Sequence, residues 1–364
     1  MSHLDNGILD SFEKVTGSGK NLSKSKLFVV ETANESIRKA KKLDNPKRMV
    51  GNFWKEGELF VLFAFTGTGK TVFSYAIAKA LSEGKDVLPI LPNECSAKKV
   101  LYYDAELSLK QFENRFSEDY KNHVKFSDNL YRMYIDRHAV LSEGQSIADS
   151  IIPEIENCIK SNKINVVIID NLSTLKSGIE QSTEAKPLMD LLVGIKHKYN
   201  VSLMIVGHTP KQHHYKEMIL ADLQGSAHLS IQLDTCVAMG NSAIDQETKY
   251  FKEVKMRDGK YLFGSDNVIT VELVKNGMLS LIYKATEDEQ NHLQNIDIAQ
   301  VTEDIINLSN NGMSIRDIEN YVPFKKSKIA QIIKENEAAD SVSTVESKDN
   351  KDTADKQLKI NSHD

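Results

Sequence analysis

The segment "FTGTGKT", residues 65–71, brings two glycines, a lysine and a hydroxyl side chain together in a pattern suited to phosphate. In such a loop backbone N–H groups point at the phosphate oxygens, and glycine lets the chain turn tightly around them. Lys70 would neutralise the β- and γ-phosphates, and Thr71 would ligate Mg²⁺. The candidate residues for binding a nucleoside triphosphate form one run: Thr66, Gly67, Thr68, Gly69, Lys70, Thr71 and Val72.

The phosphate pattern departs from expectation at one position, where Ala64 stands in place of the first glycine. This position closes the turn without contacting phosphate, so alanine is tolerable if its backbone dihedral angles are ordinary. The preceding "GELFVLFA" predicts a buried strand and the following "TVFSYAIAKAL" predicts a helix, which is the context that such a loop requires. We therefore expect nucleotide binding, with ATP and Mg²⁺ as the cofactors.

Acidic residues end two further apolar runs. "INVVIIDNLSTL" ends in Asp170, and a buried carboxylate costs free energy unless it is paired or holds a metal, so Thr71 and Asp170 are the predicted Mg²⁺ ligands. "KKVLYYDAELS" places Asp104 and Glu106 at the end of the strand that follows the phosphate-loop helix. Parallel strands end at one edge of a sheet. Glu106 is the predicted group that polarises the attacking water, with Asp104 as the alternative.

Histidines follow another buried strand, "LMIVGHTPK". His208, or alternatively Thr209, is predicted to sense the γ-phosphate and pass its presence to the next loop. His213 and His214 invite a metal interpretation, but histidines in a polar loop are more often ordinary loop residues. No carboxylate or cysteine stands at ligand spacing beside them.

The elements that must position these residues alternate along the chain. The apolar runs that predict buried strands are "LFVLFAF", "KVLYYDA", "LYRMYI", "NVVIID" and "SLMIVGH". Helical stretches lie between them, at Thr71–Glu83, Ser108–Tyr120, Gln145–Lys160 and Glu184–Tyr199. This alternation predicts a mostly parallel, twisted sheet with helices on both faces. From Ile231 to Lys284, turn signals between short strands predict antiparallel strands along one edge.

Composition divides the chain into four predicted regions. Residues 1–44 form a polar arm with one short helix near Glu35–Lys42, and residues 45–286 form the α/β domain. Residues 296–335 predict three helices, of which the last two resemble a helix-turn-helix; a plain helical appendage is the alternative. Residues 336–364 have few apolar side chains and predict a disordered tail.

Bulk composition excludes several classes of protein. The net charge of −5 gives no global attraction to nucleic acid, so local patches would have to bind it. No apolar run approaches the ~20 residues of a membrane span. The three cysteines are scattered and the first residues lack a hydrophobic block. We expect a cytoplasmic protein with no membrane partner.

The order of these segments resembles that of RecA-like P-loop ATPases, most closely the RepA-like branch of hexameric plasmid replicative helicases and related ATPases of mobile elements. The resemblance covers roughly residues 45–285. It implies a RecA-like core and a homo-oligomer, expected to be a hexamer. It also implies that Lys255 and Arg257, in "VKMRDG", reach the nucleotide of a neighbouring subunit. The implied catalytic residues are Lys70, Glu106, His208, Lys255 and Arg257.

The resemblance further implies DNA as the partner. The loop 209–226, with Gly225 and Ser226, is expected to face single-stranded DNA, and residues 314–335 are expected to contact duplex DNA. The loop is only modestly basic, with Tyr215 as its aromatic residue, which supports a helicase less than an ATPase. A replicative helicase is the first hypothesis, and a regulatory ATPase that binds DNA without unwinding it is the alternative. A small-molecule kinase is the third, but no acceptor-binding lid is evident.

Overall fold

A twisted sheet forms the centre of the computed structural model, which describes residues 28–136, 147–171, 182–209, 216–223, 231–276, 278–294, 297–319, 321–322 and 324–338. Within these residues nine strands pair in the order β11-β10-β9-β8-β3-β7-β6-β4-β5. Six of them run parallel to one another: β3 (Leu59–Ala64), β4 (Val100–Asp104), β5 (Leu130–Tyr134), β6 (Val166–Asp170), β7 (Ser202–His208) and β8 (Thr235–Asn241). The predicted parallel sheet is confirmed.

Antiparallel strands extend the sheet at one edge, as predicted: β9 (Thr248–Met256), β10 (Val268–Asn276) and β11 (Met278–Glu287). The first strand of the run from Ile231, β8, differs from the prediction because it pairs parallel with β3. Its residues from Thr235 to Gly240 are all buried, and burial on both faces is typical of a parallel strand.

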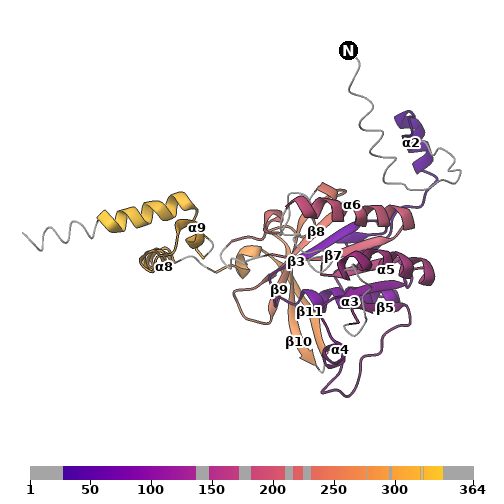
Figure 1. The fold of residues 1–364 in the computed structure, drawn as a ribbon, viewed down its shortest axis with the longest axis horizontal. Coiled ribbons are helices and arrows are strands. Elements are labelled where there is room, and N and C mark those ends of the chain that lie inside the picture. The colour runs from indigo at the N-terminus through magenta and orange to yellow at the C-terminus, as the bar shows by residue number, and fades with distance from the viewer. Residues whose placement is uncertain are drawn as a thin grey trace, which may run out of the picture. The chain divides into compact units, whose positions relative to one another are not determined.

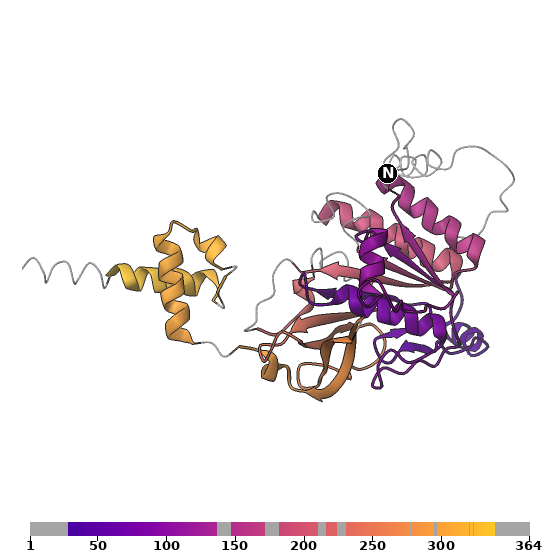
Figure 2. The ribbon, with the colours of Figure 1, turned by 90° about the horizontal axis from the view of Figure 1, so that it is seen from below.

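Helices cover both faces of the sheet (Figures 1 and 2), and apolar side chains pack beneath them. Leu59, Val61 and Phe63 of β3 pack in a core with α5 (Ile147–Asn162) and α6 (Ser182–Tyr199). The alternate residues of β3 pack on the other face with α3 (Lys70–Glu83). The strands are therefore apolar throughout their length, and polar side chains gather where the strands end.

One predicted helix is shorter than expected. The helix expected over Ser108–Tyr120 is α4 (Leu109–Arg115). Phe116, which follows it, packs in a cluster of aromatic rings. The chain then reverses direction, with a β-bridge between Glu118 and Lys121. Residues 119 and 120 adopt left-handed backbone conformations. Serine, aspartate and asparagine favour turns over helix interiors, which explains the early end.

The chain divides into two compact units at Asn45 and Pro46. The first contains α2 (Ala33–Ala40), close to where a short helix was predicted, and Thr32 and Glu35 cap it reciprocally. The second opens with a hairpin that the sequence did not predict, β1 (Arg48–Val50) and β2 (Trp54–Lys55). Residues 1–27 of the predicted arm lie outside the described residues.

The C-terminal region contains the predicted helices α8 (Ile298–Asn310) and α9 (Ile315–Ile318), followed by a helix over residues 326–338. They share a small core of their own: Ile305, Ile318, Val322, Ile329 and Ile332. The last helix continues past residue 336, where the tail was predicted to begin, and residues 339–364 lie outside the described range. Two short 3₁₀ helices precede this region, η2 (Leu220–Asp222) and η3 (Glu289–His292). Among the helices that the structure describes, none has the length and apolar character needed to cross a bilayer.

Candidate nucleotide-binding and hydrolysis site

The phosphate loop lies between the end of β3 and the start of α3. Gly67 and Gly69 have φ angles of 80° and 106°, which glycine adopts readily and other residues do not. Ala64, the departure from the usual pattern, is the last residue of β3 and pairs with His208 on one side and Met239 on the other. Alanine fits here because the position is a regular strand residue, so the loop keeps its form without the first glycine.

Lys70 presents a buried cation to this loop. Its side-chain Nζ donates to the carbonyl oxygens of Ala64 and Phe65, both at 3.0 Å, and the residue is 6% exposed. Burial lowers the pKa of Lys70 to about 8, opposed by the charges of Asp170 and Glu106. Within the described chain no carboxylate lies at ion-pair distance from its ammonium group. A buried, unpaired ammonium favours an anion, so this residue fits a phosphate group.

Asp170 ends β6 beside the loop and is 4% exposed. It accepts hydrogen bonds from the hydroxyl groups of Tyr102, at 2.6 Å, and of Ser74, at 3.4 Å, and its side chain also bonds Thr71. Burial raises the pKa of Asp170, and the charge of Glu106 raises it further. A buried carboxylate surrounded by hydroxyl groups fits Mg²⁺, which Asp170 and Thr71 would hold. When bound, the ion would neutralise charge between the β- and γ-phosphates.

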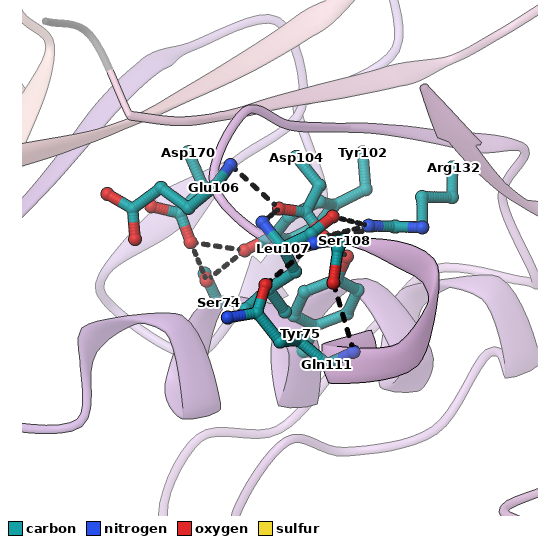
Figure 3. A network of polar contacts seen from close by, with 10 residues as sticks. All are labelled: Ser74, Tyr75, Tyr102, Asp104, Glu106, Leu107, Ser108, Gln111, Arg132 and Asp170. Carbon is teal, nitrogen blue, oxygen red and sulfur yellow. Dashed lines mark hydrogen bonds and ion pairs between the residues drawn. The ribbon is translucent and has the colours of Figure 1, made fainter. Parts of the chain in front are cut away.

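Asp104 and Asp170 lie opposite each other at the ends of the neighbouring strands β4 and β6. Glu106 follows two residues after Asp104, is exposed, and accepts a hydrogen bond from Nδ2 of Asn171. Asp104 is 3% exposed and is held by Arg132, by a tyrosine hydroxyl and by two backbone N–H groups (Figure 3). With its oxygens already bonded, Asp104 is poorly placed to take a proton from water, which favours Glu106.

His208 ends β7, next to β3, and is half-buried. Burial lowers its pKa and the charge of Lys70 lowers it further, while the charge of Asp170 opposes them. A neutral imidazole at this edge can exchange hydrogen bonds with a phosphate group. Thr209, the alternative sensor, is buried, and its backbone N–H donates to the Ala64 carbonyl at 3.2 Å.

Lys255 and Arg257 lie at the opposite end of the strands, near the residues where β3 and β8 begin. β9 runs antiparallel to β8, so Lys255 faces Cys236 near the start of β8. Arg257 forms an ion pair with Asp234 at 3.2 Å and donates to the Ile231 carbonyl at 2.6 Å. The backbone N–H of Asp234 donates to the carbonyl of Leu59, the first residue of β3. The other end of β3, where the phosphate loop begins, lies roughly 17 Å away at about 3.3 Å per residue. The structure thus brings five predicted site residues together at the ends of the parallel strands and leaves Lys255 and Arg257 at the opposite end, where the strands begin. The five are Lys70, Thr71, Glu106, Asp170 and His208.

Several predicted residues of the loop 209–226 lie outside the described residues: His213, His214, Tyr215, Gly225 and Ser226. In the described remainder of that loop, Lys216 pairs with Asp222 at 3.3 Å. Within the described ranges, histidine, cysteine, aspartate and glutamate side chains form no group of three or more suited to a metal ion.

The site also contains residues that the sequence did not single out: Ser74, Tyr75, Tyr102, Arg132 and Asn171. A signal existed for Arg132, since a charged residue within the apolar run "LYRMYI" must find a partner when the strand packs. The tyrosines gave no such signal, because an aromatic residue in a buried strand or helix is ordinary core.

The phosphate loop lies within a segment that matches a known protein family. Residues 8–214, more than half of the chain, match the AAA_25 family, described as AAA domain. The fold is also similar to that of a KaiC-like protein from the archaeon Pyrococcus horikoshii OT3, with 13% identity and a TM-score of 0.45, covering 64% of this chain and 91% of that one. No curated protein matches the chain. The chain therefore belongs to the AAA domain family, as an α/β protein in which a phosphate loop joins β3 to α3.

Proposed function

We propose that this protein is an oligomeric, ATP-hydrolysing motor that acts on DNA, of the type of the replicative helicases of plasmids and mobile elements. The observation that carries the proposal is the position of Lys255 and Arg257. They lie near the start of the parallel strands, whereas their own phosphate loop follows the end of β3. The two ends of β3 are roughly 17 Å apart at about 3.3 Å per residue. Cations so placed lie far from their own phosphate loop, which supports a role at the nucleotide of a neighbouring protomer, where Arg257 would exchange its ion pair with Asp234 for phosphate.

In this proposal each protomer supplies most of the hydrolytic site. Lys70 neutralises the phosphates, Thr71 and Asp170 hold Mg²⁺, Glu106 polarises the attacking water and His208 senses the γ-phosphate. The neighbour's Arg257 stabilises the charge that develops on the γ-phosphate, which ties hydrolysis to the contact between subunits. We propose a hexamer whose loops 209–226 contact single-stranded DNA at its centre.

A mixing experiment tests the shared site. Glu106→Gln and Arg257→Ala should each abolish most ATP hydrolysis, since an arginine supplied in this way contributes roughly 10³-fold or more. An equal mixture of the two variants should regain about a quarter of the parent rate, because random assembly places an intact Glu106 against an intact Arg257 at that share of interfaces. If Arg257 served its own nucleotide, mixing would restore nothing.

The DNA-motor part of the proposal needs its own measurements. The parent chain should hydrolyse ATP faster with single-stranded DNA, should separate the strands of a duplex, and should show a larger mass by light scattering with ATP. Lys70→Ala should remove all three effects. Hydrolysis that single-stranded DNA does not stimulate would contradict a motor that moves on DNA.

The alternative is a regulatory ATPase that binds duplex DNA and uses ATP to switch assembly. It is favoured by the separate core of the C-terminal helices and by the exposed Lys325, Lys326 and Lys328. A truncated chain should end after Gln294, because Glu289 forms a buried ion pair with Lys252 and must be kept. Loss of duplex binding with intact hydrolysis would support this alternative, and retained binding would point to the loop 209–226.

A further inference from the structure

Arg132 of β5 reaches the turn that carries Glu106, although it lies on a different strand (Figure 3). Its Nε donates to Oδ2 of Asp104 at 2.9 Å, and its Nη2 donates to the carbonyl oxygen of Leu107. The Arg132 side chain is 12% exposed and that of Asp104 is 3% exposed. One guanidinium group therefore bonds the residue before the turn and a backbone oxygen within it.

Two aromatic rings hold this guanidinium in place. Its central carbon lies 4.3 Å from the centroid of the Phe112 ring and 4.6 Å from that of the Tyr134 ring. Arginine stacks well on rings while its fork of N–H groups donates hydrogen bonds, which lysine cannot reproduce. Arg132 is thus fixed by contacts from α4 and β5 before it bonds the turn.

Asp104 passes this constraint to the backbone of Glu106. Its Oδ1 accepts the N–H groups of Glu106, at 3.2 Å, and of Leu107, at 3.0 Å. Ser108, which follows at once, is the N-cap of α4 and bonds Gln111 reciprocally. The turn is therefore held at both ends, while the carboxylate of Glu106 remains exposed and borders a hollow of about 500 Å³.

The carboxylate of Asp104 is also anchored to the phosphate-loop helix. The hydroxyl of Tyr75, five residues after Lys70 on α3, donates to Oδ2 of Asp104 at 2.9 Å. The Tyr75 ring stacks on Tyr102 with 3.8 Å between centroids, and Tyr102 donates to Asp170. A change in the position of Asp104 would therefore move the turn relative to the phosphate loop.

We propose that Arg132 is a positioning residue for hydrolysis, which acts through Asp104 and Leu107 to hold Glu106 at the distance from the γ-phosphate that water attack requires. The proposal rests on the role proposed above for Glu106. Arg132 lies behind the turn and reaches the nucleotide through Glu106, so its loss should slow the chemical step without weakening ATP binding.

The test compares Arg132→Met and Arg132→Lys with a control, Lys98→Met. Lys98 forms a partly buried ion pair with Glu56 at 2.5 Å, at the opposite end of β4. For Arg132→Met we expect kcat to fall roughly 10- to 100-fold, because a small misplacement of a catalytic group costs that much. KM and the Kd of a fluorescent ATP analogue should stay close to the parent values. Arg132→Lys keeps the charge but loses the paired N–H groups of the guanidinium, so its kcat should lie between those of the parent and Arg132→Met. The control, Lys98→Met, should keep the parent kcat.

A double variant separates positioning from mere stabilisation. Because Arg132 acts through Glu106, Glu106→Gln combined with Arg132→Met should hydrolyse no more slowly than Glu106→Gln alone. Additive losses, or ATP affinity that falls as much as kcat, would overturn the inference. A Glu106→Gln variant with the parent rate would instead reject the proposed role of Glu106 itself. If Arg132→Met does not fold, Tyr75→Phe provides the test, because it removes the hydrogen bond to Asp104 and keeps the ring stack on Tyr102. It should lower kcat and leave ATP affinity unchanged. An unchanged kcat would count against positioning through Asp104.

Discussion

Replacing Tyr102 by phenylalanine tests whether the hydroxyl groups around Asp170 hold a buried charge. Tyr102 is completely buried, and its hydroxyl donates to Oδ2 of Asp170 at 2.6 Å and lies 2.6 Å from the hydroxyl of Ser74. Phenylalanine keeps the ring and its stack on Tyr75. The substitution therefore removes one hydroxyl group and leaves the packing unchanged.

The expected size of the effect follows from these contacts. A hydrogen bond to a charged group contributes about 1.5–3 kcal/mol. Ser74 loses one partner, but its hydroxyl can donate to the Thr71 carbonyl, which lies 3.1 Å away, so little is added. We expect a loss of about 2 kcal/mol, and for a domain of this size each kcal/mol lowers Tm by roughly 2–4 °C. The Tm should fall by about 4–8 °C.

The loss should depend on pH with a definite sign. Burial raises the pKa of Asp170 above that of an unfolded aspartate. The folded chain therefore binds this proton more tightly, and Asp170 makes the fold less stable as pH rises from the unfolded pKa to the folded one. The Tyr102 hydroxyl bonds the charged form and lowers this pKa. Its removal should cost most above the folded pKa, where Asp170 is charged, and less below it.

Fluorescence can follow this unfolding, because the chain has a single tryptophan, Trp54, which is fully buried in the core of the α/β domain. Thermal unfolding of Tyr102→Phe would be compared with the parent over a pH series that runs from neutral pH down to the most acidic pH at which the chain stays folded. Tyr261→Phe makes the same chemical change at a residue that is 54% exposed and should leave Tm unchanged. A loss of Tm that does not become smaller toward acid pH would refute the argument that the hydroxyl stabilises a charge.

Four further predictions concern other positions. Burial lowers the pKa of Lys70 to about 8, so ATP affinity should weaken as pH rises through that value, and calorimetry in two buffers should detect proton uptake on binding. Gly69→Ala should destabilise the fold by about 1–2 kcal/mol because its φ of 106° is unfavourable for alanine. Gly194→Ala, in α6 with open space around the added methyl, should stabilise it by about 0.5–1 kcal/mol, and urea denaturation measures both. Lys252→Met leaves the fully buried Glu289 charged and unpaired and should cost about 3–5 kcal/mol, most of which a second change, Glu289→Met, should restore.

The parts of the fold that sequence predicts are those set by local pattern. Five continuous apolar runs became the strands β3 to β7, and the phosphate loop sits where a strand and a helix predicted it. The pairing of β8 was not predictable in this way, because a short apolar run is equally compatible with a parallel or an antiparallel neighbour. The early end of α4 combines the turn-favouring residues after Arg115 with the packing of Phe116 on Phe126, and this packing is a tertiary contact that local pattern does not reveal.

The candidate site divides along the same line. Lys70, Asp170 and Glu106 could be predicted because loop and strand ends restrict where such residues stand in the sequence. Arg132 and Tyr75 meet at Asp104 from sequence positions 28 and 29 residues away, so no spacing rule reveals them. Their proximity exists only once β5 pairs with β4 and α3 packs on the sheet.

The two aspartates that face each other across β4 and β6 show why residue type alone does not define a role. Asp104 is bonded by a guanidinium, a tyrosine hydroxyl and two backbone N–H groups, so its charge is already balanced and its oxygens are occupied. Asp170 is bonded by neutral hydroxyl groups, and within the described residues no cation pairs with it. A divalent cation would therefore gain more at Asp170, because an uncompensated buried carboxylate is the costlier of the two. The partners come from other strands and helices, and on their account we propose a structural role for Asp104 and the metal-binding role for Asp170.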